Sequence, residues 1–187
     1  MRHAKKRFAG RGVSLAELLV VLAIVGVLIT MVAPGWSGLV QAYRSRVAAD
    51  LLFSGLVLTR SEAVKRNRRV VICSSPEGER CLASVNWEQG WIVFEDTNNN
   101  GQRDLTEAIL QRQHPTGANL SISSAFASSK GYVSYLPLGR AETVDGVIQM
   151  GTFKVCIGSA SPTEVRQIVI NSAGRPRTKK SVEPHCP

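Results

Sequence analysis

The sequence is poor in the residues from which most catalytic sites are built. It contains only three histidines: His3 lies near the N-terminus, and His114 and His185 are each next to a proline. No nucleophile elbow, glycine-rich phosphate loop or close pair of carboxylates is visible. We therefore expect no enzymatic activity and no organic cofactor.

Acidic residues are also scarce, with 14 Asp and Glu against 23 Lys and Arg and a formal net charge of +9. Residues 1–12 hold five of these bases and no acid, so the rest of the chain has 18 bases, 14 acids and a charge of +4. Much of the basic character therefore belongs to a short N-terminal segment. A length of 187 residues, 44% of them hydrophobic, predicts one compact domain with an appended element.

An apolar stretch follows the basic segment and runs almost unbroken from Leu18 to Ala33. Counted from Val13, it spans about 20 residues, or roughly 30 Å of helix, which is the thickness of a bilayer's hydrocarbon core. The preceding cations are expected to stay in the cytoplasm, so the rest of the chain would face the periplasm. Glu17 lies inside this stretch, where a carboxylate costs about 2.5–3.5 kcal/mol and needs a compensating partner.

The junction resembles the class III signal of type IV pilins and type II secretion pseudopilins, because Gly12 is followed by the residues VSLAELLVV. The resemblance implies that a prepilin peptidase cleaves between Gly12 and Val13 and methylates the new amine of Val13. It also implies that Glu17 pairs with the N-terminal amine of a neighbouring subunit during assembly. The first mature residue in this family is usually Phe, so Val13 is a departure from the pattern.

The helix is expected to continue beyond the membrane as an amphipathic helix over residues 35–69. Its apolar residues recur at three- and four-residue spacing, which predicts one buried face; they are Val40, Tyr43, Val47, Leu51, Leu52 and Leu58. A basic cluster then follows at Lys65, Arg66, Arg68 and Arg69. We interpret this cluster mainly as cations that favour the C-terminal end of the helix dipole, with a DNA-facing role as the alternative.

The remainder, residues 70–187, reads as a head of short strands separated by turn residues. The predicted strands are Arg69–Ser74, Gly90–Glu95, Ala108–Arg112, Asn119–Ser123, Tyr132–Leu136, Phe153–Ile157 and Gln167–Asn171. The expected fold class is α+β, with a leader at 1–12, a transmembrane and assembly helix at 13–34, the amphipathic helix at 35–69 and a small antiparallel sheet. The segments 91–96 and 132–140 resemble the GspH/FimT branch of minor pilins and pseudopilins.

The four cysteines are Cys73, Cys81, Cys156 and Cys186, an even number that suggests two disulfides in a periplasmic domain. Three connectivities are possible. Pairing of Cys73 with Cys81 is the local choice, since the two flank a turn, and Cys156 with Cys186 then follows.

One segment fits the EF-hand pattern of oxygen-bearing side chains with a glycine at position 6. Its candidate calcium ligands are Asp96, Asn98, Asn100, Asp104 and Glu107. The flanking segments read as strands rather than helices, and only three of the ligands are charged. A hairpin loop without metal is the alternative that we favour.

The strongest functional signal is the basic segment after the last predicted strand, which we expect to be an exposed loop. Its candidate DNA-binding residues are Arg175, Arg177, Lys179 and Lys180. Closely spaced cations of this kind can each bind a backbone phosphate, whereas a solvated basic turn is the alternative. The order Gly174-Arg175-Pro176-Arg177 resembles the GRxR motif of FimT-type minor pilins, which bind DNA during natural transformation.

The resemblance therefore implies a minor type IV pilin that binds extracellular double-stranded DNA. Its expected partners are DNA, other major and minor pilins, prepilin peptidase and the inner membrane, from which the subunit would pass into a surface filament. Two alternatives use the same N-terminus: a FimU-like minor pilin that primes pilus assembly, and a GspH-type pseudopilin of the type II secretion system.

Overall fold

The computed structural model describes residues 13–82, 87–117, 119–126, 131–157 and 163–186, without the side chains of residues 31–37 and 163. The chain divides into two compact units, residues 1–40 and residues 41–187. A single helix, α1 (Leu15–Arg66), contributes to both units and is helical without interruption through Pro34 and Gly35.

The helix begins with a side-chain cap, because Ser14 Oγ accepts the backbone N–H of Glu17 at 3.2 Å. A serine followed three residues later by a glutamate is the spacing of a capping box, and an acid in the first turn favours the helix dipole. Glu17 therefore also stabilises the first turn of α1, independently of its predicted pairing with a neighbouring subunit.

No helix in the described part of the chain has a stretch that is long and apolar enough to cross a membrane. The predicted transmembrane segment at 13–34 includes residues 31–34, whose side chains lie outside the described residues.

In the second unit, α1 packs on the sheets through a face made mostly of small residues. Leu52 and Leu56 are fully buried, and the other buried apolar residues of this face are Ala48, Ala49 and Ala63. The predicted face was partly wrong, because Tyr43 is 67% exposed and Val47 is 38% exposed. Alanines let the helix backbone approach the sheets closely. The prediction counted only large apolar residues, and some of these lie beside the contact between helix and sheets and not in it.

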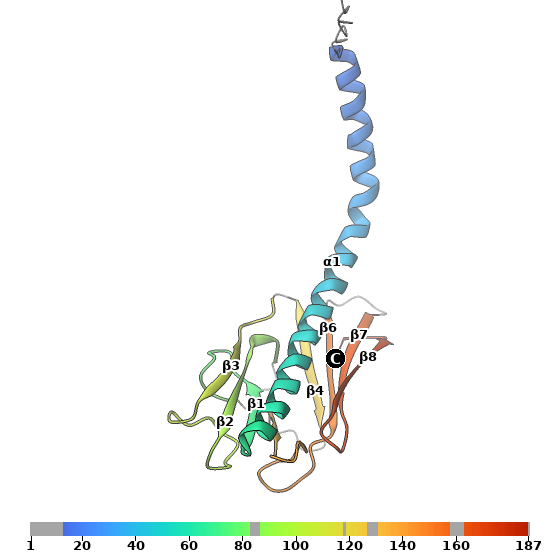
Figure 1. Ribbon diagram of the computed structural model, residues 1–187. Coiled ribbons are helices and arrows are strands. Elements are labelled where there is room, and N and C mark those ends of the chain that lie inside the picture. The colour runs from blue at the N-terminus through green and yellow to red at the C-terminus, as the bar shows by residue number, and fades with distance from the viewer. Residues whose placement is uncertain (1–12, 83–86, 118, 127–130, 158–162, 187) are drawn as a thin grey trace, which may run out of the picture. The chain divides into compact units, whose positions relative to one another are not determined.

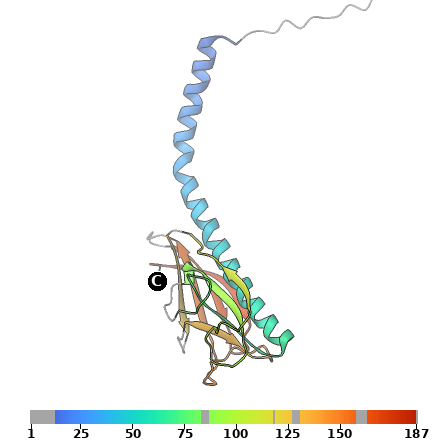
Figure 2. The same cartoon turned by 90° about the vertical axis from the view of Figure 1, so that its left-hand side faces the viewer.

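The strands form two four-stranded sheets in which all neighbours are antiparallel (Figures 1 and 2). The first has the order β3-β2-β1-β5 and contains β1 (Arg69–Ser74), β2 (Trp91–Asp96), β3 (Ile109–Gln113) and β5 (Tyr132–Tyr135). The second has the order β4-β6-β7-β8 and contains β4 (Leu120–Phe126), β6 (Gly151–Ile157), β7 (Thr163–Ile170) and β8 (Pro176–Glu183).

One core joins the helix to both sheets. Trp87, in the short 3₁₀ helix η1 (Trp87–Gln89), packs edge-on against Phe153 of β6, with ring centroids 4.9 Å apart. Phe126 of β4 packs on the same ring of Phe153, also at 4.9 Å. Leu52 and Leu56 of α1 belong to this cluster, which therefore fixes the second sheet against the helix.

The structure confirms the expected α+β fold, and each predicted strand overlaps an observed one. Two expectations were wrong. There are two sheets rather than one, and residues 176–183 form the strand β8 where a loop was predicted. The proline and the two lysines of β8 have low strand propensity, but an edge strand needs no apolar outer face, and β8 gains its hydrogen bonds from β7.

Candidate nucleic-acid interface

The predicted DNA-binding residues lie on the β7–β8 hairpin. Its turn, residues 171–175, is closed by hydrogen bonds from Asn171 N to Arg175 O at 3.3 Å and from Gly174 N to Asn171 O at 2.9 Å. The side chain of Asn171 adds a third, because its Oδ1 accepts the N–H of Arg175 at 2.9 Å. The turn thus fixes the backbone of Arg175 and leaves its side chain exposed.

Strand geometry divides the remaining candidates between two faces. Lys180 is paired with Arg166 of β7, which lies on the same face as the core residue Ile168. Arg177 and Lys179 occupy the alternate positions of β8 and therefore point to the opposite, outer face of the sheet. The structure brings Arg177 and Lys179 together on the strand that follows Arg175, and it separates Lys180 from them.

The two faces also differ in charge balance. Glu164 Oε1 lies 3.6 Å from Lys180 Nζ and 3.1 Å from Arg166 Nη2, so Lys180 has a carboxylate partner within the protein. Within the ranges that the structure describes, no ion pair involves Arg175, Arg177 or Lys179. Their charges are therefore available to an anionic ligand.

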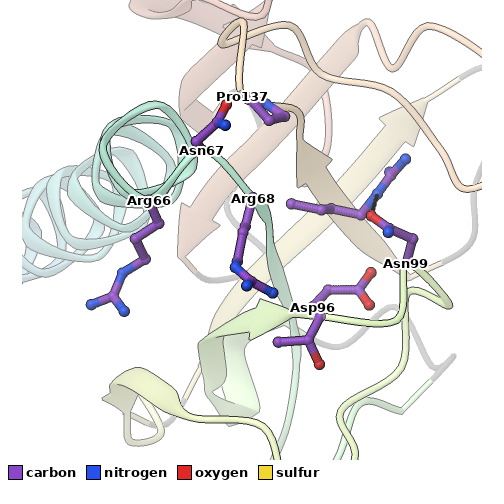
Figure 3. A pocket seen from close by; sticks show the side chains of 8 residues that line it. Arg66, Asn67, Arg68, Asp96, Asn99 and Pro137 are labelled. Atoms are coloured by element: carbon purple, nitrogen blue, oxygen red, sulfur yellow. Dashed lines mark hydrogen bonds between the residues drawn. The ribbon is translucent and has the colours of Figure 1, made fainter.

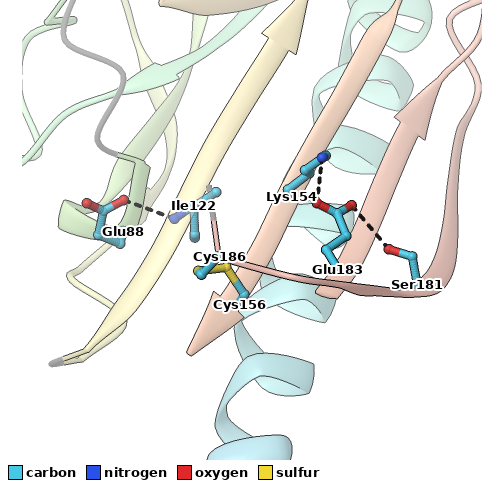
Figure 4. Close-up of a disulfide and its surroundings, with 7 residues drawn as sticks. All are labelled: Glu88, Ile122, Lys154, Cys156, Ser181, Glu183 and Cys186. Carbon is cyan, nitrogen blue, oxygen red and sulfur yellow. Dashed lines mark hydrogen bonds and ion pairs between the residues drawn. A yellow bond between two sulfur atoms is a disulfide. The ribbon is translucent and has the colours of Figure 1, made fainter. Parts of the chain in front are cut away.

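Glu183 holds the C-terminal end of β8 (Figure 4). Its Oε2 accepts a hydrogen bond from Lys154 Nζ at 2.7 Å, and its Oε1 accepts one from Gln167 Nε2 at 2.9 Å and one from Ser181 Oγ at 3.4 Å. These contacts, and the bond from Lys154 above all, lower the pKa of Glu183. Glu183 therefore balances the charge of Lys154, and among the described residues of this outer face Arg177 and Lys179 have no ion-pair partner.

Acid is expected to loosen this end of β8. Since the pKa of Glu183 is lowered on folding, its stabilising contribution is present above the ordinary value of 4.5 and is lost as the pH falls through the folded-state pKa. Amide protection factors in β8 should therefore drop below about pH 4. The variant Glu183→Gln should show lower protection at pH 7 and a smaller further drop in acid. An equal response to acid in both proteins would contradict this role.

Both expected disulfides are present in the structure. Cys156 is bonded to Cys186 across 30 residues, with their Cα atoms 5.9 Å apart, and Cys73 is bonded to Cys81 across 8 residues. The longer loop encloses both β7 and β8, and Figure 4 shows the segment after β8 returning to Cys156 on β6. This disulfide therefore ties the segment that follows β8 to β6 of the second sheet.

The predicted calcium-binding loop is held by its own hydrogen bonds. Asp96 accepts the backbone N–H groups of Asn100 and Gly101 at 3.0 and 2.9 Å. The two oxygens of Glu107 accept the backbone N–H groups of Thr97 and Asp104 at 2.7 and 3.0 Å. The charged ligand candidates are thus already acceptors within the loop.

The third charged candidate, Asp104, is also a hydrogen-bond acceptor within the loop. Its Oδ2 accepts hydrogen bonds from the side-chain amides of Asn98 and Asn100 at 2.7 and 3.0 Å. Burial is the main reason why the pKa of Asp96 is raised. In the described part of the chain, no three His, Cys, Asp or Glu side chains are grouped so that they could hold a metal ion. Calcium does not enter our proposal.

Three residues of the basic cluster at the end of α1, Arg66, Arg68 and Arg69, line a polar pocket of about 510 Å³ (Figure 3). In Figure 3, Asn67 and Pro137 lie on one side of this pocket and Asp96 lies on the other. The helix ends here because Asn67 adopts a left-handed φ of 53°, and Arg68 N bonds back to Ala63 O at 3.3 Å.

The cations of this pocket are bound within the protein. Arg66 Nη1 and Arg68 Nε lie 3.2 and 3.4 Å from the carboxylate of Glu95. Arg69 is only 8% exposed and donates to Ser134 Oγ at 2.7 Å and to Glu142 O at 2.8 Å. These contacts favour a structural role for the cluster over the alternative of a DNA-facing role.

Two processing residues were also predicted. Gly12 lies outside the described residues, whereas Val13 is described, non-helical and 70% exposed. Cleavage between them and methylation of Val13 remain predictions.

A family model described as "Type II transport protein GspH" matches residues 48–174. No curated protein gives a match. The chain is similar to the crystal structure of the type IV minor pilin FimU of Pseudomonas aeruginosa strain PAO1, with a TM-score of 0.57 and 20% identity, over 78% of this chain and 97% of that chain. It is also similar to the minor pseudopilin EpsH of the type 2 secretion system of Vibrio cholerae, with a TM-score of 0.51 and 12% identity, over 73% of this chain and 96% of that one.

At these identities the solved structures show the fold alone. The matched family and these structures are pilins and pseudopilins rather than enzymes, which agrees with the expected lack of catalysis. The family match ends at Gly174, so Arg175 and the whole of β8 lie beyond it.

Proposed function

The chain belongs to the GspH family of pilins and pseudopilins, and we propose that it is a minor type IV pilin whose head binds double-stranded DNA without sequence preference. In this proposal, prepilin peptidase removes residues 1–12, and residues 13–34 first anchor the subunit in the inner membrane. The mature helix then assembles with major and minor pilins. The head captures extracellular DNA, which retraction of the pilus draws inward for natural transformation.

The observation that carries the proposal is a set of three neighbouring cations that have no carboxylate partner among the described residues: Arg175, Arg177 and Lys179. Arg175 and Arg177 can each offer two parallel N–H donors to a phosphate, and Lys179 adds a point charge. The turn and the pairing with β7 hold their backbone in place, so little conformational entropy would be lost on binding. Contacts to phosphates alone carry no sequence information, hence the lack of sequence preference.

Three phosphate contacts predict a modest and salt-sensitive affinity. Each neutralised phosphate contributes about −0.9 to the slope of log K against log salt, so the expected slope is about −2.7. Several subunits in one filament would raise the apparent affinity by multivalency.

The double variant Arg175→Gln/Arg177→Gln is expected to lose at least about tenfold in affinity and to reduce the steepness of the salt slope by about 1.8, because two phosphate contacts are removed. The measurement is fluorescence anisotropy of a labelled duplex with the oxidised full-length chain in detergent, at several salt concentrations.

The chain offers a matched control on the same strand. Lys179→Gln and Lys180→Gln remove the same charge, but Lys180 is paired with Glu164, whereas Lys179 lies on the outer face and has no ion-pair partner in the part of the chain that the structure describes. Only Lys179→Gln should weaken binding clearly. If the wild-type protein does not bind at low salt, or if both lysine variants bind alike, DNA capture by this face is wrong.

A structural role is the second candidate, and the similarity of fold to FimU and EpsH favours it. The protein would then prime pilus assembly, or act as a pseudopilin in type II secretion, through the same helix and head. Such a subunit has no use for the three exposed cations of the hairpin, so the anisotropy experiment separates the two candidates.

A further inference from the structure

A backbone contact joins the turn of the β7–β8 hairpin to the turn that follows β5, residues 136–139. Both turns carry a glycine in the left-handed region, Gly139 and Gly174, each with a φ of +72°. A Cβ atom on Gly174 would lie 2.6 Å from the carbonyl oxygen of Gly139 and 3.1 Å from Arg140 Cα. The hairpin turn therefore packs directly against the backbone of residues 139–141.

Helix α1 binds the same carbonyl oxygen. Arg60 Nε donates to Gly139 O at 2.8 Å, and a Cβ on Gly139 would lie 3.1 Å from Arg60 Nη2. One oxygen thus contacts both Arg60 and the turn that carries Arg175, although Arg60 belongs to a different element. In Figure 1 the C-terminal end of α1 and the turn of the hairpin lie at the same end of the head.

We propose that Arg60 is a further phosphate-binding residue, which forms a single DNA site with Arg175 across this contact. The inference rests on the proposed DNA binding and extends it from the hairpin to α1. A guanidinium has five N–H donors, and the bond to Gly139 O uses only one of them, at Nε. Among the described residues, no carboxylate forms an ion pair with Arg60, so its charge is not neutralised within the protein.

The neighbouring Arg140 differs in this respect. Its Nη2 lies 2.8 Å from Glu142 Oε2, so most of its charge is balanced within the protein. Arg60 is half-buried and held at Nε, which orients its two terminal nitrogens before any ligand binds. This preorganisation lowers the entropy lost when a phosphate is bound.

The test uses the oxidised full-length chain in detergent and a labelled duplex at several salt concentrations. Arg60→Gln removes the charge but keeps an amide that can donate to Gly139 O, and it should lower affinity about three- to tenfold and flatten the salt slope by about 0.9. Arg60→Lys keeps the charge and should keep most of the slope. Arg46→Gln is the matched control: it removes an arginine of α1 that is paired with Asp50 and lies 14 residues away, about 21 Å along the helix axis.

The double variant Arg60→Gln/Arg175→Gln gives a further measurement, whose result a purely structural role of Arg60 would not change. If both arginines bind one phosphate cluster, the effects of Arg60→Gln and Arg175→Gln on the salt slope should be coupled rather than additive. An Arg60→Gln slope equal to that of wild type, with Arg175→Gln/Arg177→Gln still impaired, overturns the role of Arg60 and leaves DNA binding by the hairpin intact. Failure of the wild-type protein to bind overturns both. A loss of slope in Arg60→Lys equal to that in Arg60→Gln would also overturn the charge-based role.

Discussion

Replacing Gly174 by alanine is expected to destabilise the head by about 2–4 kcal/mol, because left-handed backbone costs an L-residue about 1–2 kcal/mol and steric overlap adds to it. Gly174 has a φ of +72°, and the new Cβ would lie 2.6 Å from Gly139 O and 2.8 Å from Ala141 N. Both neighbours are backbone atoms, so they cannot move away as a flexible side chain could. Chemical denaturation of the oxidised protein measures the loss, and DNA affinity should fall with it.

Gly78 provides the matched control for this variant. Its φ of +73° is nearly the same, but an added Cβ would lie 3.6 Å from the side-chain atom Arg112 Cδ, which is ordinary contact. Gly78→Ala should therefore show the cost of the backbone conformation without the overlap. If Gly174→Ala costs no more than Gly78→Ala, the contact between the two turns is not maintained in solution, and the basis for the role of Arg60 disappears.

Removal of the longer disulfide is expected to have the second large effect. The Cys156→Ser/Cys186→Ser double variant opens a loop of 30 residues, which in the chain-entropy account should cost about 3–4 kcal/mol of unfolding free energy. Because the loop encloses β7 and β8, the hairpin should also lose protection against hydrogen exchange and the protein should bind DNA more weakly. Denaturation, hydrogen exchange and anisotropy measure these three effects.

The other disulfide separates a general loss of stability from an effect on the hairpin. Cys73→Ser/Cys81→Ser opens a loop of only 8 residues after β1, with an expected cost of about 2–3 kcal/mol. This variant should keep the affinity of the wild-type protein under conditions where it remains folded. Equal loss of DNA binding in both double variants would show that the longer disulfide has no specific role in holding the hairpin.

Much of the fold could be predicted because local pattern and tertiary context agree. The strands β1 and β2 are rich in β-branched and aromatic residues, and the cluster of cations near the end of α1 suits the helix dipole, although the helix ends at Arg66 and not at residue 69 as predicted. The strand β8 could not be predicted, because its proline, lysines and glutamate have low strand propensity and its pairing depends on β7, which only the fold brings alongside.

The candidate DNA site could be predicted only in part, because its residues are visible in the sequence but their arrangement is not. The run of cations from Arg175 to Lys180 is visible in the sequence, but its division between two faces appears only once the segment is known to be a strand. The nearness of Arg60 depends on a contact between residues 79 positions apart, made through a glycine turn. No local pattern in the sequence signals such a contact.

The position of β8 at the edge of its sheet has a consequence for solubility. An edge strand presents unpaired backbone N–H and C=O groups to which a strand of another molecule can add, and cationic side chains oppose such addition by charge repulsion. Arg177, Lys179 and Lys180 therefore also protect the protein from self-association. Neutralising all of them at once would remove this protection and leave an edge that favours aggregation.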